Sequence, residues 1–278
     1  MAITLIWGST FTVTKFALTD LPPLTLQGMR FLVAALLVGI YTWRDIKTTT
    51  VTSLRTGLLL GLLLGAGFAL QTVGLVETTA SKAGFLTGTM VVFTPLIQLA
   101  IERRRPSKGN LIAVLIVGGG LYIFTSPAGG NFNFGDMLVL LCAVAFAFYI
   151  VYLDVFTKER FHREIVFYQF VVTAAVGFLL SPFFDATPAT FTLPAVAAVL
   201  YLSIFASSIA IFIQSKYQRE TTPTKAAIIF TMEPVFAALI AMMLLSELMS
   251  GVELLGAMIM LAGLLFSELY ALRLRRGR

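Results

Sequence analysis

The chain has 278 residues, of which 58% are hydrophobic and 12% are charged, and its mean hydropathy is +0.91. Soluble domains carry roughly 25% charged residues, so this composition excludes an ordinary soluble globule. The net charge of +6 does not indicate a nucleic-acid partner, because the basic residues are spread over short connections between apolar runs. We therefore expect an integral membrane protein whose main partner is the lipid bilayer.

Ten apolar segments follow one another, and each approaches the roughly 20 residues that a helix needs to cross a hydrocarbon core. They are residues 2–19, 24–43, 56–76, 79–101, 109–125, 135–156, 164–184, 193–215, 222–246 and 251–272. The prediction is an all-α membrane protein with ten transmembrane helices in one compact domain. The first segment has no basic leader and no cleavage site, so we interpret it as helix 1 and not as a signal peptide.

The first segment mixes an indole with hydroxyl groups on one side. Trp7, Thr10 and Thr14 share a helix face, because they are spaced three, four and seven residues apart. Such a face suits a hydrated cavity that binds a substrate better than it suits lipid. The alternative is that the threonines bond to carbonyls of their own helix and that Trp7 anchors at the membrane interface.

The second to fourth segments contain polar residues at two depths. Arg30 and Lys82 lie near helix starts, so we expect their long side chains to snorkel toward the membrane surface, as does Lys225 in the ninth segment. Gln71 lies well inside the third segment, where an amide is costly unless it is hydrogen-bonded. It contributes either to a central site or to an interhelical hydrogen bond.

Glycine and proline residues indicate packing and helix breaks. Gly57, Gly61 and Gly65 in the third segment recur every four residues, a spacing that favours close helix packing. Pro95 and Pro234 interrupt the fourth and ninth segments at nearly the same depth. Paired interruptions of this kind indicate a hinge or a binding site, and the alternative is a static kink.

The sixth segment contributes aromatic side chains. We assign Phe146 and Tyr149, one helical turn apart, to the walls of a substrate cavity. Cys142 lies in the same segment and is the only cysteine, whereas His162, the only histidine, lies in the next connection. No disulfide can form within the chain and these two residues make no metal site, so we expect no metal and no cofactor.

The eighth and ninth segments carry the remaining candidates. Gln214 shares a helix face with Ser203 and Ser207, and it has the same two interpretations as Gln71. Glu233 is the charged residue nearest to the midplane. A charge there costs at least about 2.5–3.5 kcal/mol on insertion scales, so it should face protein or water. It would bind a substrate ammonium, carry a coupling proton or form a structural ion pair.

The sequence resembles itself. Residues 71–82, QTVGLVETTASK, align with residues 214–225, QSKYQRETTPTK, 143 positions later. Near the N-terminus the offset is 139, which places Phe146 at the position of Trp7. Two homologous halves embedded in apolar sequence indicate a membrane transporter.

We place the two halves at residues 1–126 and 127–278. Each contains five predicted spans, and because five is odd the second half should enter the membrane in the opposite orientation. Most of the 20 Lys and Arg residues fall in alternate connections or in the C-terminal tail. Since cytoplasmic loops are enriched in these residues, we expect both termini in the cytoplasm and the 125–136 connection outside.

Several stretches resemble a known superfamily. They are WGSTFTVTKFAL at 7–18, ETTASKAGFLTG at 77–88 and ETTPTKAAIIFTMEPVFAALIAMMLLSELMS at 220–250, with Glu233-Pro234 and Ser246-Glu247 as the most specific pairs. The chain is similar to the drug/metabolite transporter superfamily, in particular the EamA-type ten-helix transporters. Within it, the chain looks most like bacterial amino-acid exporters of the YddG type. This resemblance implies ten helices, a central cavity and alternating access.

We therefore predict a secondary transporter of the bacterial inner membrane that exports amino acids, aromatic and other neutral ones, or related small metabolites. A cavity with aromatic rings, hydroxyls, amides and few charges suits a zwitterion. The predicted substrate-binding residues are Trp7, Thr10, Thr14, Gln71, Phe146, Tyr149, Gln214 and Glu233, and the predicted hinge residues are Pro95 and Pro234.

Other functions remain as alternatives. The same superfamily includes carriers of drugs, sugars and nucleotide sugars. A channel is a third class, and a membrane-embedded enzyme would need a nucleophile–base or metal constellation that we do not find in the sequence. There is no Walker A sequence, so we expect no ATP-driven step. The substrate, coupling ion, net direction, resting conformation and oligomeric state stay open, and a monomer is compatible with the sequence.

Overall fold

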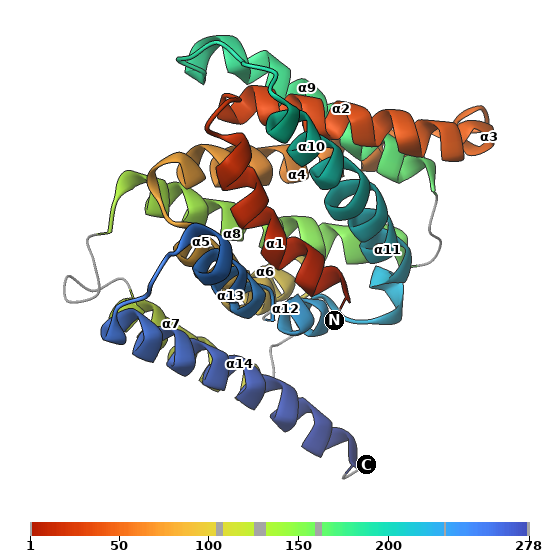
Figure 1. Cartoon of the computed structure of the whole chain (residues 1–278). Helices are drawn as coiled ribbons and strands as arrows, with labels where there is room; N and C mark the ends of the chain where they lie inside the picture. Colours follow the sequence, from red (N-terminus) through yellow and green to blue (C-terminus); the bar gives the residue numbers. More distant parts are fainter. Residues whose placement is uncertain (1, 104–107, 125–131, 159–162, 231, 277–278) are drawn as a thin grey trace.

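A computed structural model describes residues 2–103, 108–124, 132–158, 163–230 and 232–276 (Figure 1). The elements are α1 (Ala2–Ala17), α2 (Pro23–Tyr41), α3 (Trp43–Ile46), α4 (Val51–Glu77), α5 (Ala80–Gly88), α6 (Met90–Glu102), α7 (Lys108–Phe124), α8 (Phe134–Thr157), α9 (Glu164–Phe184), α10 (Leu193–Tyr201), the π-helix η1 (Leu202–Ile209), α11 (Ala210–Tyr217), the 3₁₀ turn η2 (Gln218–Glu220), α12 (Pro223–Phe230), α13 (Glu233–Leu245) and α14 (Gly251–Arg276). No strand occurs in these ranges, so the all-α prediction is confirmed for them. His162, most of the 125–136 connection and the side chain of Lys225 lie outside what the structure describes.

Among the described residues, six helical stretches are long and apolar enough to cross a membrane. They are Pro23–Tyr41, Val51–Glu77, Ala80–Glu102, Phe134–Thr157, Glu164–Phe184 and Leu193–Tyr217. The stretches Leu111–Gly120, Glu233–Leu245 and Gly251–Gly263 are shorter apolar helices. The helices follow the predicted segments closely, and a multi-span membrane protein is confirmed. The count of ten spans and their orientation stay predictions.

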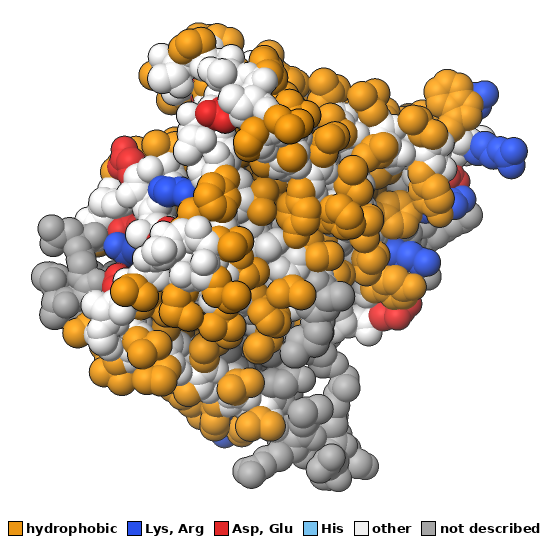
Figure 2. Space-filling model, viewed as in Figure 1, with side chains coloured by type: hydrophobic (Ala, Val, Ile, Leu, Met, Phe, Trp, Pro, Cys, Tyr) orange, Lys and Arg blue, Asp and Glu red, His pale blue; other side chains and the backbone are white. Residues whose placement is uncertain are grey.

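The surface agrees with a lipid environment. Ile40 on α2 and Phe183 on α9 are 79% and 80% exposed, and many other large apolar side chains also face outward. Figure 2 shows hydrophobic side chains over the middle of one face, with charged side chains gathered toward its left and right edges. Apolar surface of this extent suits hydrocarbon better than water.

The helices pack in a regular pattern. In Figure 1, α2 and α9 lie side by side at one edge of the bundle, and α7 and α14 form a pair at the opposite edge. Between these pairs, α1 packs on α13 and α8 packs on α6, while α4 contacts both α8 and α9. If the two halves exchanged places, the α1–α13 contact would become the α8–α6 contact. The pattern therefore agrees with the predicted repeat.

The glycines of α4 serve close packing, as predicted. A Cβ added at Gly61 would lie 2.7 Å from Cβ of Val172 on α9, and one added at Gly57 would lie 2.5 Å from Cβ of Tyr168. Contacts this short leave no room for a larger residue, so α4 and α9 meet at backbone distance.

The helix break in the fourth predicted segment is not where the sequence placed it. Pro95 lies inside α6, and the segment instead breaks at Thr89, between α5 and α6. The hydroxyl and the N–H of Thr89 both donate to the carbonyl of Leu86, which tightens the chain into a turn there. Pro234, in contrast, is the second residue of α13 and directly follows a break.

The two breaks occupy equivalent places and meet in space. Thr89 and Met232, the residues that precede α6 and α13, are 143 positions apart, the offset of the sequence repeat. A Cβ added at Gly88 would lie 3.1 Å from Cγ of Pro234, so the end of α5 abuts the start of α13. The paired interruptions therefore lie together near the middle of the bundle.

Candidate functional site

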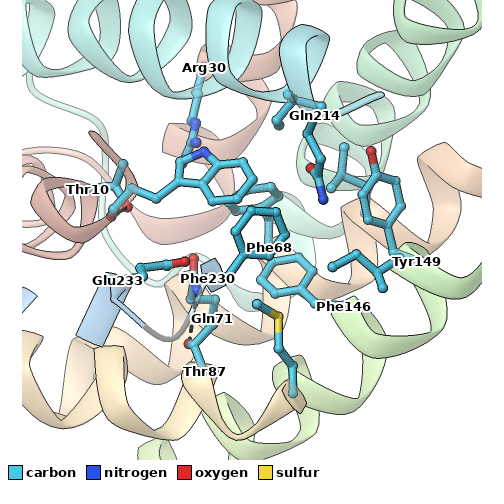
Figure 3. Close-up of a pocket in the computed structure, with 15 residues that line it drawn as sticks. Thr10, Arg30, Phe68, Gln71, Thr87, Phe146, Tyr149, Gln214, Phe230 and Glu233 are labelled. Carbon is cyan, nitrogen blue, oxygen red and sulfur yellow. Dashed lines mark hydrogen bonds between the residues drawn. The ribbon is translucent and has the colours of Figure 1, made fainter. Parts of the chain in front are cut away.

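A cavity lies beside the two helix breaks (Figure 3). Residues from α1, α2, α4, α5, α6, α8, α11, α12 and α13 contribute to it, so both halves of the chain form its walls. The lining residues are Trp7, Thr10, Arg30, Leu64, Phe68, Gln71, Thr87, Met90, Phe146, Tyr149, Ile150, Ile211, Gln214, Phe230 and Glu233. We call this space the central cavity.

The structure brings together most of the residues that the sequence singled out. Trp7, Thr10, Gln71, Phe146, Tyr149, Gln214 and Glu233 all line the central cavity. Thr14 does not, because it lies one turn further along α1 and lines a second, smaller cavity. Whether these side chains bind a substrate stays a prediction.

Aromatic rings form much of the wall. The rings of Trp7 and Phe230 meet edge to face with centroids 5.0 Å apart, and those of Phe68 and Phe146 do so at 5.2 Å. A Cβ on Gly67 would collide with the ring of Phe146, so this glycine makes room for the ring. Phe68 and Phe230 were not predicted, because phenylalanine is common in this chain and carries no distinguishing sequence signal.

Trp7 also has a structural role. Its indole N–H donates to the carbonyl of Ala206 at 3.0 Å, inside η1. The N–H of Ala210, which would serve that carbonyl in a regular α-helix, donates to Phe205 and Ser207 instead. Trp7 thus adds a hydrogen bond to a carbonyl of the π-helix in the protein interior. Trp7 therefore does not lie at the membrane interface, the alternative that its sequence position had allowed.

The hydroxyl of Thr10 bonds to the carbonyl of Trp7 at 2.6 Å, within its own helix. Gln71 donates to the hydroxyl of Thr87 at 3.2 Å, across the interface between α4 and α5. For Gln71 both interpretations therefore apply, since it lines the central cavity and also joins two helices. Tyr149 presents its ring to the cavity while its hydroxyl donates to Gln169 at 2.8 Å.

Arg30 is the main residue that the sequence interpretation placed wrongly. Its side chain does not snorkel, since the residue is only 5% exposed and lines the central cavity. Its Nε donates to the hydroxyl of Ser207 at 2.8 Å, and the guanidinium lies 4.5 Å from the ring centre of Phe68. Among the described residues, its Nη2 is buried without a hydrogen-bond partner. Arg30 lies on the face of α2 that points toward the protein interior, so its side chain is held there and does not reach the surface.

A sequence signal for Arg30 did exist. The predicted polar stripe on the eighth segment included Ser207, which is the hydrogen-bond partner of Arg30. Gln169, which aligns with Arg30 in the repeat, is also fully buried. Two polar residues at equivalent depths indicate an interior role better than a single residue does.

Glu233 lies at the first position of α13 and is 7% exposed. In the described part of the chain, its carboxylate has no hydrogen bond and no ion pair, so the structural ion pair considered for it is not found there. The positive end of the α13 helix dipole favours an anion at this position. Figure 3 shows Arg30 at the top of the cavity and Glu233, Gln71 and Thr87 further down, with the rings of Phe68 and Phe146 to their right.

Lys82 is also placed differently from the expectation. Instead of snorkelling, its Nζ forms an ion pair with Asp136 at 2.6 Å, and the two side chains are 10% and 0% exposed. Asp136 accepts a further hydrogen bond from the hydroxyl of Thr78. This pair joins α5 to α8 away from the central cavity. The described residues contain no cluster of His, Cys, Asp and Glu that could hold a metal ion.

Comparison with known proteins adds independent findings. The model of the EamA-like transporter family matches residues 1–126 and again residues 133–269. An uncharacterized transporter of Archaeoglobus fulgidus is 32% identical, over 96% of this chain and 83% of its own length. An uncharacterized inner membrane transporter of Escherichia coli K12, YedA, is 28% identical over 91% of this chain and 83% of its own.

Two further matches bear on substrate and fold. A protein of Rickettsia bellii named as an S-adenosylmethionine uptake transporter is 25% identical over 75% of this chain and 70% of its own. A crystal structure that is 19% identical superposes with a TM-score of 0.73 over 98% of this chain and 96% of its own, which shows a shared fold. A special likeness to YddG-type exporters is not tested by these matches.

Proposed function

The chain belongs to the EamA-like transporter family, and we propose that it carries amino acids or closely related zwitterionic metabolites through the central cavity by alternating access. The family membership and the multi-span helical fold make it a membrane transporter. The substrate class and the transport direction are the parts that we propose.

One observation carries the choice of substrate. Arg30 and Glu233 lie on opposite sides of a largely apolar cavity, and no ion pair joins them in the described structure. Buried charges are costly unless they are paired. A zwitterion supplies both partners at once, because its carboxylate matches the guanidinium of Arg30 and its ammonium matches the carboxylate of Glu233. The aromatic walls then remain for the substrate side chain.

Further observations support alternating access in an inverted repeat. The family model matches each half separately, at residues 1–126 and 133–269, close to the halves expected at 1–126 and 127–278. The helix breaks at Thr89 and Met232 lie at equivalent positions beside the cavity. Discontinuous helices at the repeat interface are where such transporters bind their substrates. We propose inner-membrane location, cytoplasmic termini and export on the same basis.

A counterflow screen tests this function. The purified protein, reconstituted into liposomes preloaded with each neutral amino acid in turn, should exchange labelled amino acid from outside and show saturation. Glucose and a lipophilic cation serve as matched non-zwitterionic solutes and should not exchange. If glucose or the lipophilic cation exchanged while no amino acid did, the proposal would be contradicted. Flux without saturation or counterflow would indicate a channel.

S-adenosylmethionine is a second candidate substrate for the same screen, because the Rickettsia relative is named as an S-adenosylmethionine uptake transporter. This molecule combines an amino-acid head with a sulfonium and an adenine ring. The amino-acid head would meet Arg30 and Glu233, and the faces of Trp7, Phe146 and Phe230 would receive the sulfonium or the adenine. Preferential exchange of S-adenosylmethionine over methionine would favour this candidate.

A further inference from the structure

A second, smaller cavity adjoins Arg30, between α1, α2, α4 and η1. It is lined by Thr14, Leu26, Gln27, Arg30, Phe31, Phe68, Thr72 and Leu202. It shares Arg30 and Phe68 with the central cavity, so the two spaces adjoin at these side chains. The zwitterion proposed above occupies only the central cavity and leaves this smaller one without a role.

Gln27 provides an acceptor whose orientation is fixed. Its Nε2 donates to the carbonyls of Gly65 at 3.1 Å and Thr173 at 3.2 Å, so the amide cannot turn over without losing both bonds. Its Oε1 is buried and has no hydrogen-bond partner. An unpartnered buried acceptor is costly, and a group that donates a hydrogen bond would remove that cost.

Arg30 lines the same cavity and provides a donor. Its Nε is used by Ser207, whereas its Nη2 is buried without a partner among the described residues. A guanidinium has five N–H donors in a planar fork, so it can bind a carboxylate and, through an adjacent N–H, a neighbouring hydroxyl. The hydroxyls of Thr14 and Thr72 lie on two further helices that line the same space. Leu26, Phe31 and Leu202 close the rest with apolar surface.

We propose that this second cavity is a subsite for a hydroxyl group on the side chain of the transported amino acid. A hydroxyl donates and accepts at once, so it satisfies Oε1 of Gln27 and Nη2 of Arg30 together. A methyl group of the same size satisfies neither. Because water competes for a polar space, a group that cannot reproduce the hydrogen bonds of water loses affinity there. The subsite rests on the proposed function, since it requires a substrate whose carboxylate binds Arg30.

Pairs of amino acids that differ in one hydroxyl test the subsite. In counterflow with the intact protein in liposomes, threonine should compete roughly tenfold better than valine, and serine better than alanine, because the rejected analogue leaves buried polar groups unpaired. Leucine and methionine, which differ in shape and not in hydroxyl content, serve as a control pair and should differ less.

Variants assign the effect to this cavity. Thr72→Val removes one lining hydroxyl with little change in volume and should lower the threonine-over-valine preference about threefold or more. Thr72→Ser retains the hydroxyl and should restore the preference. Thr94→Val is the matched control, because Thr94 is fully buried, lines neither cavity and bonds only to the carbonyl of Met90 in its own helix.

The outcomes separate the two proposals. Exchange of amino acids with equal competition by threonine and valine overturns the subsite and leaves the proposed function in place. The subsite is also overturned if Thr72→Val and Thr94→Val change the preference for threonine over valine by the same factor. The absence of exchange with every amino acid overturns both proposals.

Discussion

Lys82 with Asp136 and Arg30 with Glu233 are pairs of opposite charges buried in the described part of the chain, and the two pairs differ in how their charges are satisfied. Lys82 and Asp136 form a direct ion pair at 2.6 Å, and the carboxylate of Asp136 also accepts hydrogen bonds from Thr78 and from the backbone of Asn133. Arg30 and Glu233 lie on opposite sides of the central cavity and do not pair, although each is almost fully buried.

We propose that Lys82 and Asp136 form a structural pair, whereas Arg30 and Glu233 form a pair that binds the substrate, called the binding pair below. A fully hydrogen-bonded ion pair holds two helices in register, and its charges gain nothing by binding a ligand. Two separated charges that share one cavity can still form ion pairs and hydrogen bonds. A charged ligand therefore gains the most binding free energy at these two residues. The first pair should therefore govern stability, and the second should govern transport.

The largest effect should come from breaking the structural pair. Asp136→Ala removes the carboxylate that pairs with the buried Lys82 ammonium and also removes one half of the capping box at the start of α8. Removal of one partner of a buried pair costs about 3–5 kcal/mol, so thermal unfolding in detergent should shift strongly downward. The double variant Lys82→Met with Asp136→Leu removes both charges and should recover part of that loss. An unchanged midpoint for Asp136→Ala would show that the pair contributes nothing.

The binding pair should behave in the opposite way. Arg30→Gln and Glu233→Gln each remove a charge that has no charged partner among the described residues, so the unfolding midpoint should stay close to that of the wild type or rise. Hydrogen bonds to charged groups contribute about 1.5–3 kcal/mol, so transport efficiency should fall roughly 10–150-fold in each variant. Arg30→Gln should weaken substrates with a carboxylate in particular, and the corresponding amides serve as controls. If both variants transported normally but unfolded at a lower temperature, Arg30 and Glu233 would have a structural role.

This comparison also shows what sequence could and could not establish. The ten apolar segments matched the helices closely, because hydrophobic length is a local property of the chain. Lys82 and Arg30 were both expected to snorkel, since each lies near a helix start. Their actual environments depend on Asp136, 54 positions after Lys82, and on Ser207, 177 positions after Arg30, and no local pattern encodes such pairings.

The convergence of the candidate residues on one cavity was easier to predict than the positions of the helix breaks. Trp7, Gln71, Phe146 and Gln214 converge because repeat-related residues lie near the interface of the halves, which the sequence repeat made visible. Proline was a poorer guide. The break at Thr89 depends on a hydroxyl that bonds back to Leu86, and threonine does this in many unbroken helices as well. The role of η1 had no sequence signal, because π-helices have no distinctive composition.

A smaller effect on transport is expected from Gly67→Ala, which places a methyl group against the ring of Phe146 in the wall of the central cavity. In Gly67→Ala the added methyl would collide with the ring of Phe146 and push it toward the central cavity. Overpacking of this kind costs about 1–3 kcal/mol, and the displaced ring should raise the KM for substrates with large side chains more than for alanine. Gly118→Ala is the control, since a Cβ there meets nothing within 4 Å. Equal KM changes for large and small substrates would argue against a wall function for Phe146.

A small effect on stability, and the most informative result about motion, is expected from Pro234→Ala. Proline is well tolerated at the start of a helix, so its replacement should change stability by only about 0.4–1 kcal/mol. Pro234 contacts Gly88 at the point where the two helix breaks meet, and alanine would add a backbone donor there. If the paired breaks act as a hinge, α12 and α13 should straighten, and the population should shift toward one open side without loss of substrate binding.

Distances between spin labels can detect this shift. Phe184 and Leu248 are exposed residues at one end of the bundle, and Trp43 and Lys158 are exposed at the predicted opposite end. In Pro234→Ala one pair should move apart while the other approaches, because alternating access opens one side as it closes the other. Pro182→Ala in α9, which lies away from both breaks, is the matched control and should leave both distances unchanged. If the Pro234→Ala distances match the wild type with and without substrate while transport proceeds at the normal rate, the proline is a static kink, and the hinge must be sought at Thr89 instead.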